Sequence, residues 1–245
     1  MPPTRVALIS DLHLDPSAPD TQALAVRYLE TALDDVTALY ILGDLFEAWV
    51  GDDDTVDWAA PFLNALAAVS ARGVAVTLMH GNRDFLLGED FAGRVGATLD
   101  RADTAVVELG AHRALVMHGD TLCTDDTDYL AVRAAVRTPE WQRAFLAQPL
   151  ADRQAQAKAL RAESRAKTAA KQLALTDAHP AACAAALREH RADWLVHGHT
   201  HRPGTHRCGD GTRHVLGEWL PGGATVALLD DHGVRLAHWP PGPSP

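Results

Sequence analysis

The chain has 245 residues, of which 47% are hydrophobic and 22% charged, fractions that are ordinary for a folded globular protein with a sizeable core. Its formal net charge of −10 at pH 7 argues against general binding of nucleic acid, which needs a basic surface. The three cysteines, Cys123, Cys183 and Cys208, form no CxxC pair, so we expect free thiols in a reducing compartment.

The N-terminal half alternates short apolar runs with amphipathic segments. Runs rich in β-branched residues, which are typical of buried strands, occupy residues 6–10, 39–42 and 74–79. Helices are predicted from about residue 21 to 35 and from 58 to 72, because apolar side chains recur there at helical spacing. This alternation indicates an α/β fold.

The C-terminal half begins and ends with strands but has a helical segment between them. Apolar runs predict strands at residues 115–117, 194–196, 214–216, 225–229 and 234–236. Between residues 125 and about 190 no convincing strand is found, only helix-forming residues interrupted by prolines. Two glycine-containing turns, at residues 209–211 and 231–233, suggest antiparallel hairpins.

These elements predict a single domain spanning residues 1–245, a two-sheet αββα sandwich with a helical insertion at about 125–190. The insertion follows His118 and precedes His199, so both its ends lie beside the polar residues considered next. We therefore expect it to act as a cap. The proline-rich tail at 240–245 is expected to be frayed.

Polar side chains follow five of the apolar runs, at the point where each run ends. In open α/β sheets ligands bind beyond the carboxyl ends of strands, so we expect these side chains at one shared edge. Carboxylate, imidazole and amide oxygen together suit divalent Mn, Fe or Zn, and their number is right for two ions. Two-metal sites most often catalyse hydrolysis at phosphorus. The candidate metal ligands are Asp11, His13, Asp44, Asn82, His118, His199 and His201.

Taken singly, most of these motifs are weak signals. Asp11-x-His13 and the glycines beside Asp44 and Asn82 are also ordinary turn chemistry. Three alternating histidines at His197, His199 and His201 form a stronger signal, because such a pattern rarely arises for packing alone. The joint occurrence of all the motifs favours a functional site.

As an ordered set the motifs resemble the calcineurin-like metallophosphoesterases. The set is Asp11-x-His13, Gly43-Asp44, Gly81-Asn82-x-Asp84, His118-Gly119 and Gly198-His199-x-His201. The resemblance implies one ion held by Asp11, His13, Asp44 and His201, and a second held by Asp44, Asn82, His118 and His199. It implies Mn²⁺ as the metal and catalytic roles for Asp44, Asn82, Arg83 and His118. His197 matches no ligand, and we interpret it as a packing or supporting residue.

A narrower resemblance runs nearly end to end and includes residues 39–54, 80–88 and 118–126. These segments are similar to the family of lipid A biosynthesis enzymes that hydrolyse UDP-2,3-diacylglucosamine. In that family water attacks the uridine-side phosphorus, giving UMP and 2,3-diacylglucosamine 1-phosphate. The resemblance implies a peripheral location on the cytoplasmic face of the inner membrane. It also implies substrate contacts by Asn82, Arg83, Asp126, Ser164, Thr168, Lys171 and His199.

Arg83 occupies a position at which many phosphoesterases of this superfamily carry histidine. Arginine cannot act as a general acid, because it stays charged at any working pH. A phosphate monoester is a weakly basic leaving group that needs little protonation, and Arg83 can instead bind it and neutralise its charge. The alternative is a structural salt bridge between Arg83 and Asp84.

The predicted cap contains a cationic and an apolar group of residues. Residues 151–172 are rich in Lys and Arg, and such a stretch, which includes Arg153 and Arg161, is solvated by default. Ser164, Thr168 and Lys171 share one helix face with Arg161 beside them, although Thr168 stands where the resembled family has Asn. Trp141 and Phe145 have helical spacing with Leu146 beside them, and they either line an acyl chamber or pack the cap against the body.

Two other functions remain open from the sequence. One is a phosphoesterase acting on a soluble nucleotide pyrophosphate or phosphodiester, and the other is a scaffold that has lost its metals. No apolar segment resembles a signal peptide or approaches the roughly 18 residues of a spanning helix, so a cytoplasmic protein is expected. We expect two partners, the lipid-nucleotide substrate and the membrane surface, and no nucleic acid.

Overall fold

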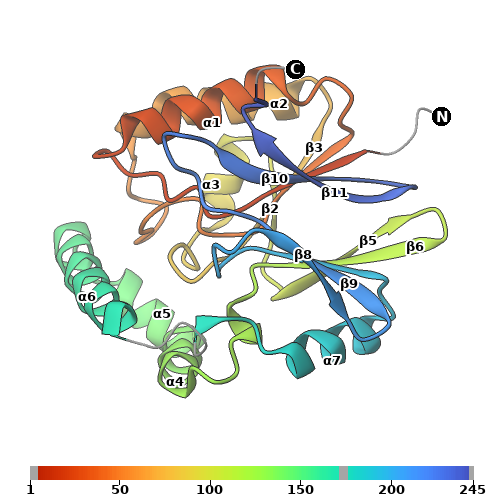
Figure 1. Cartoon of the computed structure of the whole chain (residues 1–245). Coiled ribbons are helices and arrows are strands. Elements are labelled where there is room, and N and C mark those ends of the chain that lie inside the picture. Colours follow the sequence, from red (N-terminus) through yellow and green to blue (C-terminus); the bar gives the residue numbers. More distant parts are fainter. Residues whose placement is uncertain (1–4, 171–175, 243–245) are drawn as a thin grey trace.

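Two β-sheets face each other at the centre of the molecule, with helices on their outer faces (Figure 1). This computed structural model describes residues 5–170 and 176–242, without the side chains of residues 163 and 165–170. The first sheet has the order β11 (Gly233–Trp239), β10 (Ala224–Asp230), β1 (Val6–Ile9), β2 (Ala38–Ile41), β3 (Ala75–Met79) and β4 (Thr98–Asp100). The second has the order β5 (Thr104–Leu109), β6 (His112–Met117), β7 (Trp194–His197), β9 (Gly211–Val215) and β8 (Gly204–Cys208).

The central strands are buried on both faces, which explains why they are apolar runs and not alternating patterns. In β1, Val6 and Leu8 pack into the core between the sheets, whereas Ala7 and Ile9 pack against helices on the outer face. Successive side chains of a strand point to opposite faces, so four consecutive apolar residues supply two cores at once. The predicted two-sheet α/β sandwich is confirmed.

The outer face of the first sheet is covered by α1 (Pro19–Thr31), α2 (Ala60–Ala71) and the short α3 (Glu89–Arg94). A 3-10 turn, η1 (Asp57–Ala59), precedes α2. The two helices predicted in this half are confirmed, with α1 beginning two residues earlier than expected at Pro19. Proline is favoured in the first helical turn because its missing N–H has no intrahelical partner there.

The segment predicted as one cap consists of two structurally different parts. After the 3-10 turn η2 (Asp120–Leu122), α4 (Thr127–Val136), α5 (Pro139–Leu146) and α6 (Leu150–Ala170) project to one side of the sandwich (Figure 1). In contrast, α7 (Pro180–His190) covers the outer face of the second sheet, where Cys183 and Leu187 pack against Leu115 and Leu195. The expected cap boundary near residue 190 is therefore too late. The second sheet needs an apolar cover, and α7 supplies it.

Three strands were not among those predicted from apolar runs in the sequence. β4 is only three residues long, β8 is mostly exposed and polar, and β5 pairs with β6 at the edge of the second sheet. Both predicted hairpins are confirmed, since β8–β9 and β10–β11 are antiparallel pairs joined by the expected turns. Among the described residues, no helix combines the length and apolarity needed to cross a membrane.

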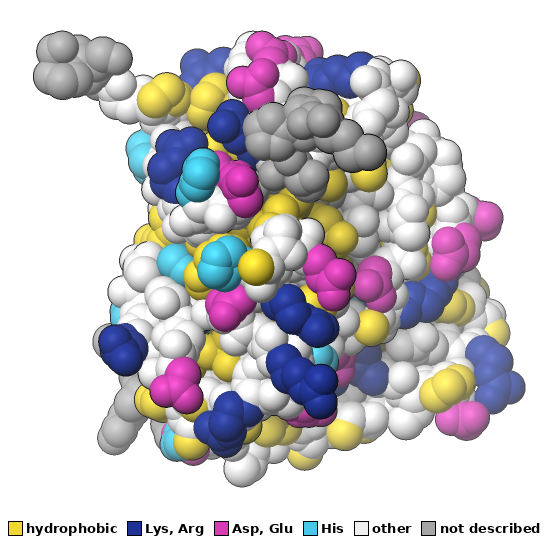
Figure 2. All heavy atoms as spheres, turned by 90° about the vertical axis from the view of Figure 1, so that its right-hand side faces the viewer, with side chains coloured by type: hydrophobic (Ala, Val, Ile, Leu, Met, Phe, Trp, Pro, Cys, Tyr) yellow, Lys and Arg dark blue, Asp and Glu magenta, His cyan; other side chains and the backbone are white. Residues whose placement is uncertain are grey.

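The end of the sandwich farthest from the cap helices has no concentrated charge. Figure 2 shows acidic and basic side chains interspersed with apolar ones over that face. Charges of both signs thus lie near one another among the described residues of that face.

Candidate metal centre

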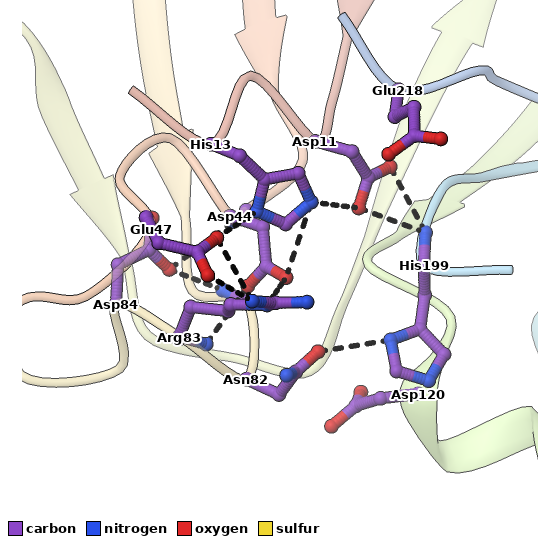
Figure 3. A network of polar contacts seen from close by, with 12 residues as sticks. Asp11, His13, Asp44, Glu47, Asn82, Arg83, Asp84, Asp120, His199 and Glu218 are labelled. Atoms are coloured by element: carbon purple, nitrogen blue, oxygen red, sulfur yellow. Dashed lines mark hydrogen bonds and ion pairs between the residues drawn. The ribbon is translucent and has the colours of Figure 1, made fainter. Parts of the chain in front are cut away.

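The seven predicted ligands come together where the carboxyl ends of parallel strands from both sheets meet. Asp11 and His13 follow β1, Asp44 follows β2 and Asn82 follows β3, all in the first sheet. His118 follows β6, and His199 and His201 follow β7, in the second. Figure 3 shows His199, from the second sheet, facing Asp11 and Asn82 of the first.

One group of atoms gathers around the imidazoles of His13 and His201. Their Nε2 atoms lie 3.3 Å apart, and the Nε2 of His201 is also 3.3 Å from Oδ1 of Asp11. Asp44 lies at the border of this group, with its Oδ2 4.0 Å from the Nε2 of His13. Such separations are those of ligand atoms that surround a common centre.

A second group gathers around Asn82. Its side-chain oxygen is 2.9 Å from the Nε2 of His118 and 2.9 Å from the Nδ1 of His199. The other oxygen of Asp44, Oδ1, lies 3.8 Å from the Nε2 of His118. Asp44 therefore presents one carboxylate oxygen to each group, the arrangement that a bridging ligand requires.

Five of the seven residues have left-handed backbone conformations, which residues other than glycine rarely adopt. The φ angles are 56° for Asp11, 47° for His13, 51° for Asp44, 63° for His199 and 51° for His201. Such conformations cost about 1–3 kcal/mol each and concentrate at functional sites. Gly43 allows the close approach of the loops, because a Cβ there would lie 2.3 Å from the backbone nitrogen of Gly81.

Three of the histidines are oriented by an acceptor behind the ring. The Nδ1 of His118 donates to the carbonyl of Leu42 at 3.0 Å, and the Nδ1 atoms of His13 and His201 lie 3.3 Å from Glu47 and 3.1 Å from Glu218. These acceptors favour the tautomer with the proton on Nδ1, which leaves the Nε2 lone pair facing the centre.

The Nε2 atoms of these rings face the other members of the site. The Nε2 of His118 is directed at the side-chain oxygen of Asn82, and that of His201 at Oδ1 of Asp11. A divalent ion can take the place of a proton between such atoms, so the donor set fits divalent metal ions.

The carboxylates give the site a strong preference for positive charge. Burial would raise the pKa of Asp11, but its hydrogen bond with His201 and the nearby histidine charges lower it below its usual range. Burial would lower the pKa of His201, but hydrogen bonds to Asp11 and Glu218 raise it to about 10. Burial and the charge of His118 lower the pKa of His199 to about 4, so that ring is neutral, as a metal ligand must be.

Arg83 pairs with Glu47 and Asp44 and not with Asp84, so the partner expected in the structural alternative is wrong. Its Nη1 donates to both oxygens of Glu47 at 2.9 Å, and its Nε lies 3.3 Å from Oδ2 of Asp44. Asp84 is fully buried and accepts hydrogen bonds from the backbone N–H groups of Asp44, Leu45 and Gly81. The function of Asp84 is thus to fix the loops that carry Asp44 and Asn82.

Three carboxylates that support the site were not singled out from the sequence: Glu47, Glu218 and Asp120. Burial would raise the pKa of Glu47, but its hydrogen bond with His13 and the charge of Arg83 lower it to about 2. Asp120 accepts hydrogen bonds from Tyr129 and Arg133 of α4. No periodicity marks these residues, and only the motif segments in which Glu47 and Asp120 lie offered a signal.

The cap helices are attached to the body by arginines that the sequence assigned to a solvated face. Arg153 of α6 is 1% exposed, and it pairs with Asp53 and donates to the carbonyl of Gln148 at 3.0 Å. Arg161 of α6 donates to Oε1 of Glu47 at 3.0 Å. The solvated interpretation is therefore wrong for Arg153 and Arg161.

The residues of the insertion that the sequence predicts to contact substrate lie in different surroundings. Asp126 is the N-cap of α4, where its side chain accepts from the backbone N–H of Tyr129 at 3.1 Å. The Tyr129 ring lies 5.9 Å from that of His199, so α4 lies beside this candidate ligand. Ser164 is exposed on α6. The Thr168 side chain and Lys171 lie outside the described residues.

The apolar residues of α5 pack against the body. Trp141 stacks on Phe145 with a ring separation of 4.9 Å and lies 6.0 Å from Phe85 of the body. Phe145 is buried, whereas Leu146 is 41% exposed. Packing of the cap, one of the two alternatives, is thus the observed role of Trp141 and Phe145.

A cleft of about 450 Å³ opens beside His13 and His201. Its charged wall consists of Glu47, Arg83 and Arg161, and its apolar wall includes Trp219 and Leu220. The volume is in the range of small-molecule sites, roughly 300–1,000 Å³. The metal centre is therefore open to a ligand on this side.

Comparison with known proteins gives a consistent assignment. Residues 4–203 match the family model described as calcineurin-like phosphoesterase. A UDP-2,3-diacylglucosamine hydrolase of Chromohalobacter salexigens is 46% identical over 234 residues, covering 94% of this chain and 95% of the relative. A protein of the same name from Klebsiella pneumoniae is 44% identical over 236 residues, covering 95% and 98%. A solved archaeal phosphodiesterase has a similar fold, with a TM-score of 0.50, 15% identity and coverage of 96% and 99%.

Proposed function

The chain belongs to the calcineurin-like phosphoesterase family, and from that premise we propose that it hydrolyses the pyrophosphate bond of UDP-2,3-diacylglucosamine. Water attacks the uridine-side phosphorus, and the products are UMP and 2,3-diacylglucosamine 1-phosphate of lipid A biosynthesis. The observation that carries this proposal is the similarity, over more than nine-tenths of the chain, to relatives named UDP-2,3-diacylglucosamine hydrolase. The convergence of all seven candidate ligands supports it.

The centre suits two divalent ions, which we propose to be Mn²⁺. One would be held by Asp11, His13, Asp44 and His201, and the other by Asp44, Asn82, His118 and His199. When bound, such a pair lowers the pKa of water and offsets the charge of a phosphate. Asp44 is the shared ligand, and Asp84 and Leu42 hold Asp44 and His118 in place through the hydrogen bonds described above.

Arg83 acts on the phosphates of the substrate. Its Nε lies 3.3 Å from Oδ2 of Asp44, so a phosphate bound at the shared ligand is within its reach. The leaving group is a phosphate monoester, and a guanidinium can stabilise its developing charge without giving up a proton.

Selectivity for the lipid substrate comes from the cap helices α4–α6. Asp126, Ser164, Thr168 and Lys171, together with Asn82, Arg83 and His199 of the body, contact the glucosamine phosphate. The exposed Leu146 and Leu160 on the cap offer apolar surface toward acyl chains or a membrane. We place the enzyme at the cytoplasmic face of the inner membrane, attached peripherally.

The test is release of UMP in the presence of Mn²⁺ from three substrates: UDP-2,3-diacylglucosamine, UDP-glucosamine and a soluble dinucleotide that contains uridine. We expect rapid release from the diacylated substrate alone. Equal or faster hydrolysis of the dinucleotide would favour the soluble-substrate alternative. Metal analysis of the purified protein tests the scaffold alternative, because a scaffold would hold no stoichiometric pair of ions.

A further inference from the structure

Glu47 is the residue at which three separate parts of the site meet. It follows β2 on the loop that carries Asp44, and its carboxylate points toward both His13 and Arg83 (Figure 3). Both of its oxygens accept from the Nη1 of Arg83 at 2.9 Å, and Oε2 lies 3.3 Å from the Nδ1 of His13. From the cap, Arg161 donates to Oε1 through Nη2 at 3.0 Å and through Nε at 3.3 Å.

This cluster is largely shielded from solvent. The side chains of Glu47, Arg83 and Arg161 are 20%, 19% and 15% exposed. Charge-assisted hydrogen bonds in such surroundings are stronger and less screened than ion pairs on an open surface. The three side chains also line the cleft beside His13 and His201, so their arrangement decides what charge an entering ligand meets.

The charge balance explains why a carboxylate is needed here. Two guanidinium groups that bind one carboxylate lie close enough to repel each other strongly in partly dry surroundings. The charge of Glu47 lies between them and offsets this repulsion. Asp44 also pairs with the Nε of Arg83, and the donors of both guanidiniums are already oriented when an anionic ligand arrives.

We propose that Glu47 is a positioning residue that holds Arg83 and Arg161 together at the His13 side of the metal centre, and thereby joins cap helix α6 to the body. This inference rests on the proposed function, because the ligand that uses both guanidiniums is the diphosphate of the substrate. Binding is favoured because little side-chain entropy remains to be lost when the diphosphate enters.

The first experiment is a double-mutant cycle on kcat and KM with Glu47→Gln and Arg161→Gln. Each variant is assayed at a Mn²⁺ concentration at least about tenfold above its own measured dissociation constant, because Glu47 also contacts the proposed ligand His13 and outer-shell partners affect metal affinity. We expect each single change to raise KM about tenfold, with kcat within about threefold, since a charge-assisted contact is lost. The double variant should be little worse than either single one, because the two residues act as a unit.

The matched control is Asp53→Asn, a carboxylate-to-amide change at another arginine of the same helix. Asp53 pairs with Arg153, and neither residue lines the cleft. Even if Asp53→Asn changes kcat or KM by itself, in the double variant the free-energy effects of Asp53→Asn and Arg161→Gln should add. An additive cycle between Glu47 and Arg161, or an unchanged or lowered KM for Glu47→Gln, would overturn the proposal. A lowered KM would mean that Glu47 competes with the substrate for the guanidiniums.

A second measurement needs neither metal nor substrate. In metal-free protein, Glu47→Gln and Arg161→Gln should each speed amide hydrogen exchange in residues 157–162 of α6 by about tenfold or more, because the helix loses an attachment. Unchanged exchange in both would contradict the proposal. If the wild type releases no UMP, the proposed function fails, while this measurement still decides whether Glu47 holds α6. If Glu47→Gln does not fold, Arg161→Gln tests the same contact from the cap side.

Discussion

Individual residues at the metal centre have backbone conformations that folding alone would not select. Asp11, His13 and Asp44 all have positive φ angles, and backbone hydrogen bonds join their loops, with the N–H of Asp11 donating to Gly43 and that of His13 to Asp44. The strain is balanced by these contacts and by the packing of the two sheets. A binding function explains why such backbone conformations are retained.

Asp44 is the residue on which both groups of ligands depend. We expect Asp44→Asn to lower kcat by more than about a hundredfold and to reduce bound metal, since losing a shared ligand should exceed the ten- to hundredfold effect of an outer-shell partner. Asparagine tolerates the left-handed conformation, so the fold should persist. Kinetics and metal analysis check this, with the exposed Asp35→Asn as control. Near-normal turnover with two bound ions would contradict the assignment of Asp44.

Arg83 is expected to act on the substrate more than on the fold. Arg83→Gln should lower kcat/KM by more than about tenfold, from the loss of a charge-assisted contact to phosphate. The thermal midpoint should fall by less than about 4 °C, which corresponds to about 1 kcal/mol for a chain of this size. A large fall in thermal midpoint with unchanged kinetics would assign Arg83 a purely structural role.

At the scale of elements, the helices after Asp120 divide between the body and the cap. Leu187 of α7 is 4% exposed and packs under the second sheet, whereas Leu160 of α6 is 55% exposed. The same substitution should therefore affect stability much more in α7 than in α6.

Leu187→Ala should reduce the free energy of unfolding by about 2–5 kcal/mol, because it leaves a cavity in a packed core. Leu160→Ala should change it by less than about 0.5 kcal/mol, as is usual for exposed positions. Denaturant unfolding of both variants provides the measurement. If the two variants are equally stable, α7 is not part of the packed body, contrary to what the structure indicates.

At the scale of the whole molecule, the metal centre joins the two sheets. Divalent ions that bind only the folded chain stabilise it by mass action, by about 2.7 kcal/mol at a concentration one hundred times the dissociation constant. We expect a chelator to lower the thermal midpoint and added Mn²⁺ to restore it. A midpoint that is the same in chelator and in excess Mn²⁺ would count against ion binding at the junction.

The cap and the body together should determine substrate choice. The body carries the candidate ligands, and we expect acyl chains remote from the reacting phosphorus to contribute binding energy through the cap. We expect kcat/KM for UDP-2,3-diacylglucosamine to exceed that for UDP-glucosamine by more than about a hundredfold. A ratio near one would make the cap a structural cover without a role in selectivity.

The sequence by itself determined the α/β class, the central strands and the meeting of seven polar residues. These features depend on short-range rules: apolar runs predict strands, and the residues after parallel strands lie at one edge of a sheet. Asp11, His13 and His201 could therefore be identified although 188 residues separate the two histidines.

Only the tertiary structure decided which charged residues are partners and which helix covers which face. Arg153 lies in a polar segment that periodicity assigns to solvent, yet it is buried against Asp53, 100 residues away in the chain. Glu47 looks like any exposed acid until α6 brings Arg161 to it across 114 residues. Composition and periodicity describe one element at a time, whereas these pairings arise from packing between elements, so their physical cause exists only in the folded chain.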